Sequence, residues 1–445
     1  MKKVLILGAG MVAKPIIQYL LNSNIIVTVA TQIQSDADKL IAGHKNGRSV
    51  SWSADDEDTL SKLVAEHNIT VSLLPYNFHV NVAKICIQQK RSMLTTSYVK
   101  PHMYDLNEKA KEANIIILNE LGVDPGIDHM SAMRIIENVH KKGGKIDEFY
   151  SFCGALVAPE VEKNPFNYKF TWAPKTVVMA GNNDAKYLRN GEEVYIPSKD
   201  IFKDPLIVDF PEIGEIEVYP NRDSLPYIKL YGIPETKTII RGTFRYKKWC
   251  EINIVMKALN LFSYDKINLK DKTYADLMAI LINADNSQNI KQKIADYSNI
   301  SIDSNPIVAM EWIGLFDDKK IGTDEDSPYN ITSDLMIKKM MISEEERDMV
   351  VMQHTFAASY PDGKKEVIKS RMLDFGSLKT DTSIARTVAL PAAVGVKMLL
   401  EGKIKATGVH IPVIPEIYKP ILDSLEELDI KMVEEYGLPL SENIK

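Results

Sequence analysis

The sequence predicts an α/β fold built on a Rossmann-type, doubly wound parallel sheet, and two observations near its start carry this prediction. Short apolar runs alternate with helical patterns at the spacing of βαβ units. The first run, Lys3–Leu7, leads directly into GAGMVA, where Gly8, Gly10 and Ala13 match the G-x-G-x-x-G/A pattern of a dinucleotide-binding turn. A strand before this pattern and a helix after it make the match specific.

The remaining elements of this region follow from the same alternation. Buried strands are expected at the short apolar runs 3–7, 25–30, 70–76, 92–98 and 114–120, with a weaker strand at 49–52. Helices are expected at 11–22, 35–44, 80–89 and 103–113. The free N–H groups at the start of the first helix would stabilise a phosphate. A flavodoxin-like or nucleotide-free α/β domain is the alternative that fits this alternation.

The chain changes character after residue 146. Segments rich in aromatic residues, proline and asparagine are typical of a second domain whose loops form a binding surface. Residues from 250 to about 316 have mainly helical patterns, which predicts a helical insertion. Strand-like segments and two helices follow.

Composition restricts the function classes. The chain has 445 residues and a net charge of −6, so no overall positive field attracts nucleic acid or anionic membranes. The cysteines Cys86, Cys153 and Cys250 have no C-x-x-C spacing, which favours a reducing compartment. The N-terminal apolar run breaks at Gly8 and no apolar segment reaches about 18 residues. We therefore expect a cytoplasmic protein without a membrane span.

The end of the second strand normally selects the cofactor. An acid there indicates NAD, and an arginine accommodates the 2′-phosphate of NADP. This chain has Thr31 and Gln32, which leave the choice between NAD and NADP open.

The segment NELGVDPGIDHM, residues 119–130, concentrates polar side chains after the sixth expected strand. Glu120, Asp124, Asp128 and His129 are of the types that bind divalent ions. No second cluster of ligands accompanies them, and ligands of such sheets lie at this edge, so we expect no metal. Asp128 and His129 are instead expected to cap and start a helix over 130–139.

A cationic strand occurs within residues 238–249. Alternation places Arg241, Thr243 and Arg245 on one face, and together with Arg222 they could bind carboxylates. The alternative is a solvated strand with Arg222 paired to Asp223. From these residues alone the solvated strand is favoured, because charged residues lie mostly on surfaces.

Ten motifs connect the chain to a known family. They are LLPY at 73–76, TTSYVKP at 95–101, ELGVDPGIDHM at 120–130, SFCGALVAPE at 151–160, NPFNYKFTW at 164–172, YPNRDS at 219–224, RGTFRY at 241–246, MEWIGL at 310–315, ARTVALPAA at 385–393 and PEIYKPIL at 415–422. In these motifs, over nearly its whole length, the chain resembles saccharopine dehydrogenases of the L-glutamate-forming type.

The resemblance implies an oxidoreductase of the aminoadipate route of lysine metabolism. Such an enzyme interconverts saccharopine with L-glutamate and 2-aminoadipate 6-semialdehyde, using NAD or NADP, and forms a homodimer. The resemblance also implies three domains. These are a dinucleotide-binding domain at 1–128, with helices of 385–445 packing back on it, an α/β substrate-binding and dimerisation domain at 129–248 and about 330–384, and a helical domain at 249–329.

Site residues follow from the matching motifs. Gly8 of the glycine turn and the family's cofactor contacts give Gly8, Gly10, Met11, Val12, Thr31, Gln32, Ser53, Ala54, Leu74, Thr96, Ser97, Val123, Asp124 and Pro125. The implied saccharopine contacts are Ser97, Tyr98, Asp124, Cys153, Arg222, Thr243, Phe244 and Arg245, and we add Arg241 because saccharopine carries several carboxylates.

Asp124 is the catalytic candidate and is expected to stabilise the ammonium of the substrate. Whether it is also the general base stays open, because an ordinary aspartate pKa of about 3.9 suits a base poorly. Tyr98, Cys153, His129 or a water are the other candidates for proton transfer.

Two departures and two alternatives accompany the resemblance. Gln32 replaces the arginine of NADP-dependent members, and Ala173 stands where members often have serine. A carboxynorspermidine synthase-like imine reductase would need an acidic site, which Arg222 and Arg245 argue against. A non-catalytic dinucleotide-binding protein of the same fold is the second alternative.

Overall fold

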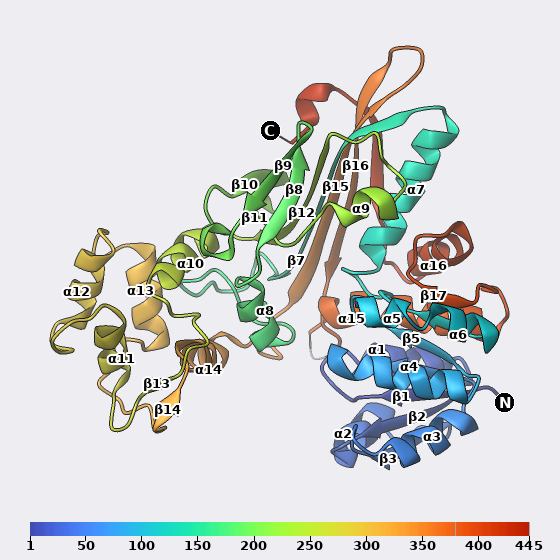
Figure 1. The fold of residues 1–445 in the computed structure, drawn as a ribbon, viewed down its shortest axis with the longest axis horizontal. Coiled ribbons are helices and arrows are strands. Elements are labelled where there is room, and N and C mark those ends of the chain that lie inside the picture. The colour runs from blue at the N-terminus through green and yellow to red at the C-terminus, as the bar shows by residue number, and fades with distance from the viewer. Residues whose placement is uncertain (379, 445) are drawn as a thin grey trace.

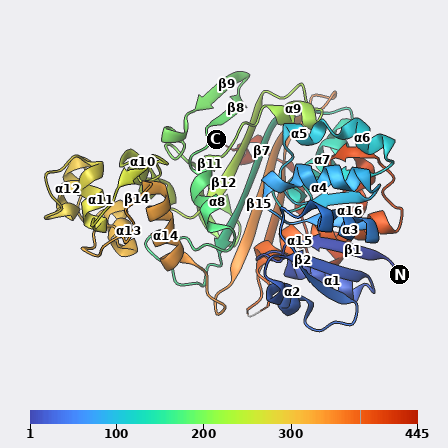
Figure 2. The same ribbon diagram turned by 60° about the horizontal axis from the view of Figure 1, so that its bottom comes forward.

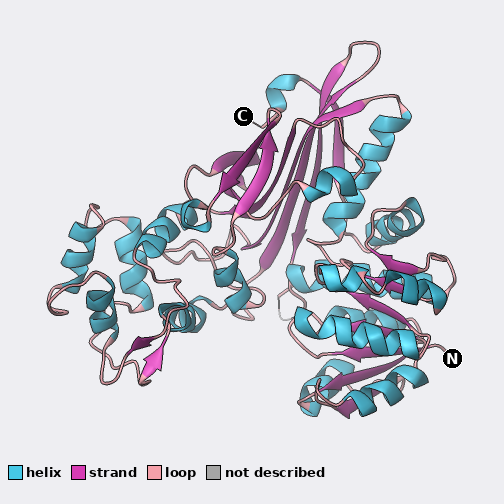
Figure 3. Cartoon of the chain, in the orientation of Figure 1, coloured by secondary structure: helices cyan, strands magenta, loops and turns pink. Residues whose placement is uncertain are grey.

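The computed structural model describes residues 1–378 and 380–444. A parallel sheet with its helices lies at one end of the molecule and a helical lobe at the other, with a large mixed sheet between them (Figures 1 and 2). Colouring by secondary structure makes this division plain, because the outer lobe consists almost entirely of helices (Figure 3).

The first sheet has the Rossmann order. Its parallel strands run β17-β6-β5-β4-β1-β2-β3, and their bounds are β1 Lys3–Leu7, β2 Ile26–Thr31, β3 Gly47–Ser51, β4 Ile69–Ser72, β5 Ser92–Thr95, β6 Ile116–Leu118 and β17 Gly408–His410. Strand order reverses between β1 and β4, which confirms the doubly wound fold and excludes the flavodoxin-like order. Its helices are α1 Lys14–Asn22, α2 Gln34–Ile41, α3 Glu57–Glu66, α4 His79–Gln88, α5 Pro101–Tyr104 and α6 Asn107–Glu112.

Several elements are shorter than the sequence indicates. The strands expected to reach residues 76, 98 and 120 end at Ser72, Thr95 and Leu118, and loops follow each of them. The first helix begins at Lys14 rather than at residue 11, with a proline in its first turn. The apolar runs therefore continue past the strand ends into the loops that face the ligand edge of the sheet.

The second sheet is mixed. Its main path is β10-β11-β12-β7-β15-β16-β18, and β8 and β9 join it beside β12. The bounds are β7 Lys145–Val157, β8 Ala185–Arg189, β9 Glu192–Ile196, β10 Leu206–Phe210, β11 Gly214–Pro220, β12 Thr238–Arg245, β15 Asp348–Ser359, β16 Lys365–Phe375 and β18 Val433–Leu438. Strands β7 and β12 are parallel, in a register that pairs Cys153 with Thr243. The helices α7 Ile127–Lys141, α8 Pro174–Ala180, α9 Pro226–Leu230 and α16 Pro415–Glu427 accompany this sheet.

The outer lobe is formed by five helices and a small sheet. The helices are α10 Trp249–Ala258, α11 Tyr274–Leu281, α12 Ile290–Tyr297, α13 Asn305–Ile313 and α14 Pro328–Met340. The strands β13 Ile267–Asn268 and β14 Glu325–Asp326 pair with each other. One apolar core extends from the mixed sheet into these helices, so the lobe is packed onto the sheet.

Helix α15, Ser383–Leu400, lies at the junction of the two sheets. It contacts α1 and β5 of the parallel sheet and also β15 and β16 of the mixed sheet. Within the described residues it is the helix long and apolar enough to cross a membrane by length and composition. The fold buries 72% of it, as expected for a helix at the centre of a core.

Candidate active site

The glycine turn fits a dinucleotide pyrophosphate. Gly8 has a φ of +103°, and a Cβ there would lie 3.2 Å from the carbonyl oxygen of Leu73, so this position requires glycine. No atom lies within 4 Å of a Cβ built on Gly10, which leaves its backbone open to a phosphate at the start of α1. The residues present therefore suit the cofactor that the sequence predicts.

The remaining predicted cofactor residues gather at the same edge of the sheet. Each lies at or just after the carboxyl end of a parallel strand, where ligands of such sheets lie: Met11, Val12, Thr31, Gln32, Ser53, Ala54, Leu74, Thr96, Ser97, Val123, Asp124 and Pro125. Gln32 is exposed and uncharged, so it can donate a hydrogen bond to a phosphate without neutralising it. Ala173 is the N-cap residue of α8 and provides no side-chain cap.

A buried histidine that the sequence did not single out supports this edge. The Nε2 atom of His79 lies 2.9 Å from the Ser97 hydroxyl, and its Nδ1 lies 2.9 Å from the Ser72 hydroxyl. Burial lowers the pKa of His79 to about 4, so its ring is neutral at pH 7. In the sequence, only its position could have indicated this role, because His79 is the first residue of α4, directly after the loop that follows β4.

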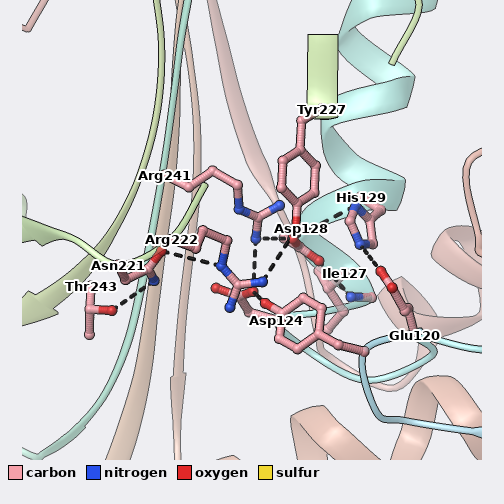
Figure 4. Close-up of polar contacts among 12 residues, drawn as sticks. Glu120, Asp124, Ile127, Asp128, His129, Asn221, Arg222, Tyr227, Arg241 and Thr243 are labelled. Carbon is pink, nitrogen blue, oxygen red and sulfur yellow. Dashed lines mark hydrogen bonds and ion pairs between the residues drawn. The ribbon is translucent and has the colours of Figure 1, made fainter. Parts of the chain in front are cut away.

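Asp124 lies at the centre of a polar cluster (Figure 4). The Tyr98 hydroxyl donates to Asp124 Oδ1, and the Arg222 guanidinium lies 3.9 Å from the centroid of the Tyr98 ring. Arg222 donates to Asn221 Oδ1 and to the Tyr227 hydroxyl, and it makes no ion pair with Asp223. The alternative in which Arg222 is paired with Asp223 is therefore wrong.

Arg241 bonds the same oxygen of Asp124 as Tyr98 does and is only 1% exposed. Its Nη2 donates to Asp124 Oδ1 at 2.8 Å and to Asp128 Oδ2 at 2.5 Å, and its Nη1 donates to the Tyr231 hydroxyl at 3.1 Å. Two carboxylates of the protein bond Nη2 and a hydroxyl bonds Nη1, so only the Nε of Arg241 is left for the substrate carboxylate expected there. Arg241 holds Asp124.

Asp128 and His129 lie in the first turn of α7, and of the two only Asp128 contributes to capping it. Helix α7 begins at Ile127 with Gly126 as its N-cap residue, so both side chains lie inside the first turn. Asp128 accepts from the Gly126 N–H and from Arg241. His129 is fully buried, and its ring nitrogens lie 2.7 Å from Glu120 Oε2 and 2.7 Å from the Tyr231 hydroxyl. The correction follows from burial, because polar groups without water need partners inside the protein.

Successive side chains of β12 face opposite sides of the sheet, as expected. Not all of the residues predicted for the site therefore contribute a side chain to it. Thr243 accepts a hydrogen bond from Asn221, whereas the Phe244 ring packs on Phe152 in the core. Phe244 therefore offers only its backbone, because alternate side chains of a strand face opposite sides. Cys153 pairs with Thr243 across the sheet, and burial raises the pKa of its thiol well above the usual value.

Arg245 is buried and lacks a carboxylate partner within the described part of the chain. Its guanidinium lies 4.8 Å from the Tyr168 ring centroid and 5.3 Å from the Trp249 ring centroid, and its Nη1 donates to the Phe244 carbonyl oxygen. Its Nε has no partner. Burial of Arg241 and Arg245 shows that the solvated-strand interpretation is wrong. Arg245 is thus a buried cation that a ligand carboxylate would complement.

No group of three His, Cys, Asp or Glu side chains in the described ranges is arranged to hold a metal ion. Asp124 and Asp128 are both engaged by Arg241. The acids of residues 119–130 thus serve an ion-pair network.

Comparison with known proteins gives consistent matches along the chain. The saccharopine dehydrogenase NADP binding domain model matches residues 4–118, and the saccharopine dehydrogenase C-terminal domain model matches residues 122–430. The chain belongs to the saccharopine dehydrogenase family. The resemblance inferred from the ordered motifs is therefore confirmed.

Relatives of this saccharopine dehydrogenase family member cover its full length. The saccharopine dehydrogenase [NADP(+), L-glutamate-forming] of Schizosaccharomyces pombe is 35% identical over 98% of this chain and 99% of its own length. The mitochondrial alpha-aminoadipic semialdehyde synthase of Bos taurus is also 35% identical, but the match covers 47% of that protein. Apo histidine-tagged saccharopine dehydrogenase (L-Glu forming) from Saccharomyces cerevisiae superposes with a TM-score of 0.91 at 33% identity, covering 98% of this chain and 100% of that one.

Proposed function

We propose that this chain interconverts saccharopine with L-glutamate and 2-aminoadipate 6-semialdehyde in lysine metabolism, using NADP(H) or NAD(H). The observation that carries the proposal is the position of Asp124. It lies at the cofactor edge of the parallel sheet and is held by Arg241 from the mixed sheet, with Tyr98 and Arg222 beside it. A nicotinamide and a carboxylate-rich substrate would meet at this point.

The arginines suit the substrate's charge. A chain with net charge −6 can hold a ligand with several carboxylates only through local cations. Arg222 and Arg245 are such cations, because no carboxylate of the described residues pairs with either. A polyamine-type substrate would meet these positive charges unfavourably, which argues against the carboxynorspermidine synthase-like alternative.

The proton transfer is best assigned to Asp124 or to a water that it holds. Burial raises the pKa of Tyr98 and of Cys153 well above their usual values, so both stay protonated at pH 7 and cannot accept a proton. Both ring nitrogens of His129 are hydrogen-bonded, one to Glu120 and one to Tyr231, so neither is free to take a proton from the substrate. Bound cofactor would supply the hydride acceptor for oxidation of the C–N bond. Asp124 would bind the substrate ammonium and orient it toward the cofactor edge.

We also propose a cytoplasmic homodimer. The three cysteines are free thiols, which agrees with a reducing compartment. Strand β18 ends the mixed sheet and exposes 63% of Val433, so its free edge is available to a second copy. Sedimentation of the wild type and of a Val433→Lys variant tests this arrangement, and a monomeric wild type would contradict it.

The test of the activity is a spectrophotometric assay with saccharopine and either NAD+ or NADP+. Formation of reduced nicotinamide with one or both cofactors is expected, and unequal rates decide the cofactor preference. Absence of turnover with both cofactors would overturn the proposed function. Binding of nicotinamide cofactor without turnover would support the non-catalytic alternative.

A further inference from the structure

We propose that the buried pair Glu120 and His129 is a positioning unit of this active site. It holds Tyr98 through the neighbouring backbone and Arg241 through Tyr231, and these are the two residues that bond Asp124 Oδ1. The inference rests on the proposed function for its kinetic consequences. Its structural consequences can be measured without any turnover.

The contacts form a closed ring (Figure 4 shows the part around Asp124, Arg241, His129 and Glu120). Glu120 Oε1 accepts from the Val99 N–H at 2.8 Å, and Glu120 Oε2 lies 2.7 Å from His129 Nε2. His129 Nδ1 lies 2.7 Å from the Tyr231 hydroxyl, which accepts from Arg241. The ring then runs through Arg241 and Asp124 to Tyr98, the residue before Val99. Every link is a direct hydrogen bond or a peptide bond.

The hydrogen count gives the ring a direction. Arg241 can only donate, so the Tyr231 oxygen accepts from it and the Tyr231 proton is left for His129 Nδ1. His129 Nε2 then carries the proton and donates it to Glu120. Glu120 therefore needs both carboxylate oxygens, one for His129 and one for Val99. A glutamine has one acceptor oxygen and can bond both Val99 and His129 only if His129 changes its tautomer.

The backbone of Glu120 indicates that its placement is constrained. Its φ is +60°, in the left-handed region that a residue with a Cβ adopts at the expense of stability. Its side chain is 6% exposed. In this unfavourable backbone conformation the carboxylate bonds both Val99 and His129.

Other buried histidines show what a merely structural pair looks like. His67 bonds the Leu63 carbonyl oxygen and the Thr28 hydroxyl, and neither partner contacts the Asp124 cluster. His354 bonds Ser131 but also interacts electrostatically with Asp128 and Arg241, so His67 is the independent comparison. The pair of Glu120 and His129 differs because both of its ends reach residues that hold Asp124.

The kinetic test uses Glu120→Gln and His129→Gln, with His67→Gln as the matched histidine control. Both test variants are expected to lower kcat by about 10- to 100-fold, because small misplacements of reacting groups reduce rates by such factors. KM for saccharopine should change less than kcat, since Arg222 and Arg245, the proposed carboxylate contacts, lie outside the ring. His67→Gln should retain kcat near that of the wild type. A kcat within about twofold of wild type in both test variants would overturn the proposal.

A second measurement is independent of turnover. Isotope-labelled tyrosine gives an NMR resonance for Tyr98, assigned by its loss in Tyr98→Phe. This resonance should move in Glu120→Gln and His129→Gln and stay in place in His67→Gln. An unmoved Tyr98 resonance in both test variants would overturn the positioning role even if the wild type does not oxidise saccharopine. Inactivity of the wild type would overturn only the proposed function.

Discussion

At the scale of residues, the structure separates three arginines that the sequence groups together. Arg241 is neutralised by Asp124 and Asp128, whereas Arg222 and Arg245 lie against aromatic rings and form no ion pair with a carboxylate of the described residues. Desolvated cations without anionic partners are unfavourable unless a ligand supplies the anion. Arg241 therefore organises the site, and the other two are available for substrate.

Replacing Asp124 tests the centre of this arrangement. Asp124→Asn removes the negative charge that would hold the substrate ammonium and receive its proton, so kcat should fall by about 100-fold or more. The control is Asp209→Asn, at an exposed position of β10. Steady-state kinetics over a range of pH are the measurement. Turnover and a pH profile unchanged from wild type would remove Asp124 from the mechanism.

Replacing Arg222 tests carboxylate binding. Arg222→Gln should raise KM for saccharopine by about 10- to 100-fold, because a charge-assisted hydrogen bond to a carboxylate is lost. Binding of NADP(H) should be nearly unchanged. Arg189→Gln, at the exposed end of β8, is the matched control. An equal KM in the two variants would contradict the assignment of Arg222 to the substrate.

At the scale of elements, the loops after the parallel strands carry the site. In the glycine turn, one glycine is needed for the backbone conformation and the other for cofactor binding. Gly8→Ala should lower stability by about 1–2 kcal/mol, because its φ of +103° disfavours a Cβ. Gly10→Ala should leave the melting temperature unchanged and weaken cofactor binding, since its Cβ would fill open space meant for a phosphate. Thermal unfolding and cofactor titration of both variants separate the two effects. A Gly10→Ala variant with unaltered cofactor affinity would place the pyrophosphate elsewhere.

The features that could be predicted from the sequence are those that depend on residues close together in the chain. The alternation of β1 to β6 with helices is local, and the glycine turn carries its own signature. Strand β17 escaped prediction because its three residues join the sheet beside β6 from nearly 300 positions away. The pairing of Arg241 with Asp124 and the inward role of His129 escaped it for the same reason, since both depend on contacts between distant segments.

At the scale of the whole molecule, the two sheets are connected through polar and apolar contacts. Arg241 of β12 is paired with Asp124, which follows β6, and α15 packs on elements of both sheets. One apolar core also includes residues of both sheets, among them Val4, Leu118, Val350 and Met372. We therefore expect the two sheets to unfold together in one transition. A change at a buried group in either sheet should then shift that transition.

Two buried histidines make this transition depend on pH. Burial lowers the pKa of His79, in the parallel-sheet region, to about 4 and that of His354, in the mixed sheet, to about 3, from 6.5. The unfolded chain binds these protons at higher pH than the folded chain does, so stability present above pH 6.5 is lost as the pH falls toward 4. Each group contributes a slope of about 1.4 kcal/mol per pH unit in this window.

Removing one of these histidines should make the free energy of unfolding of the whole protein depend less steeply on pH. His354→Gln and His79→Gln are each expected to reduce the slope of the unfolding free energy by about 1.4 kcal/mol per pH unit between about pH 4.5 and 6. Replacing His102, which is 85% exposed, serves as the control and should leave the slope unchanged. Urea unfolding at several pH values is the measurement. If each variant altered a separate transition, the two sheets would unfold independently, and the apolar core that they share would not couple their unfolding.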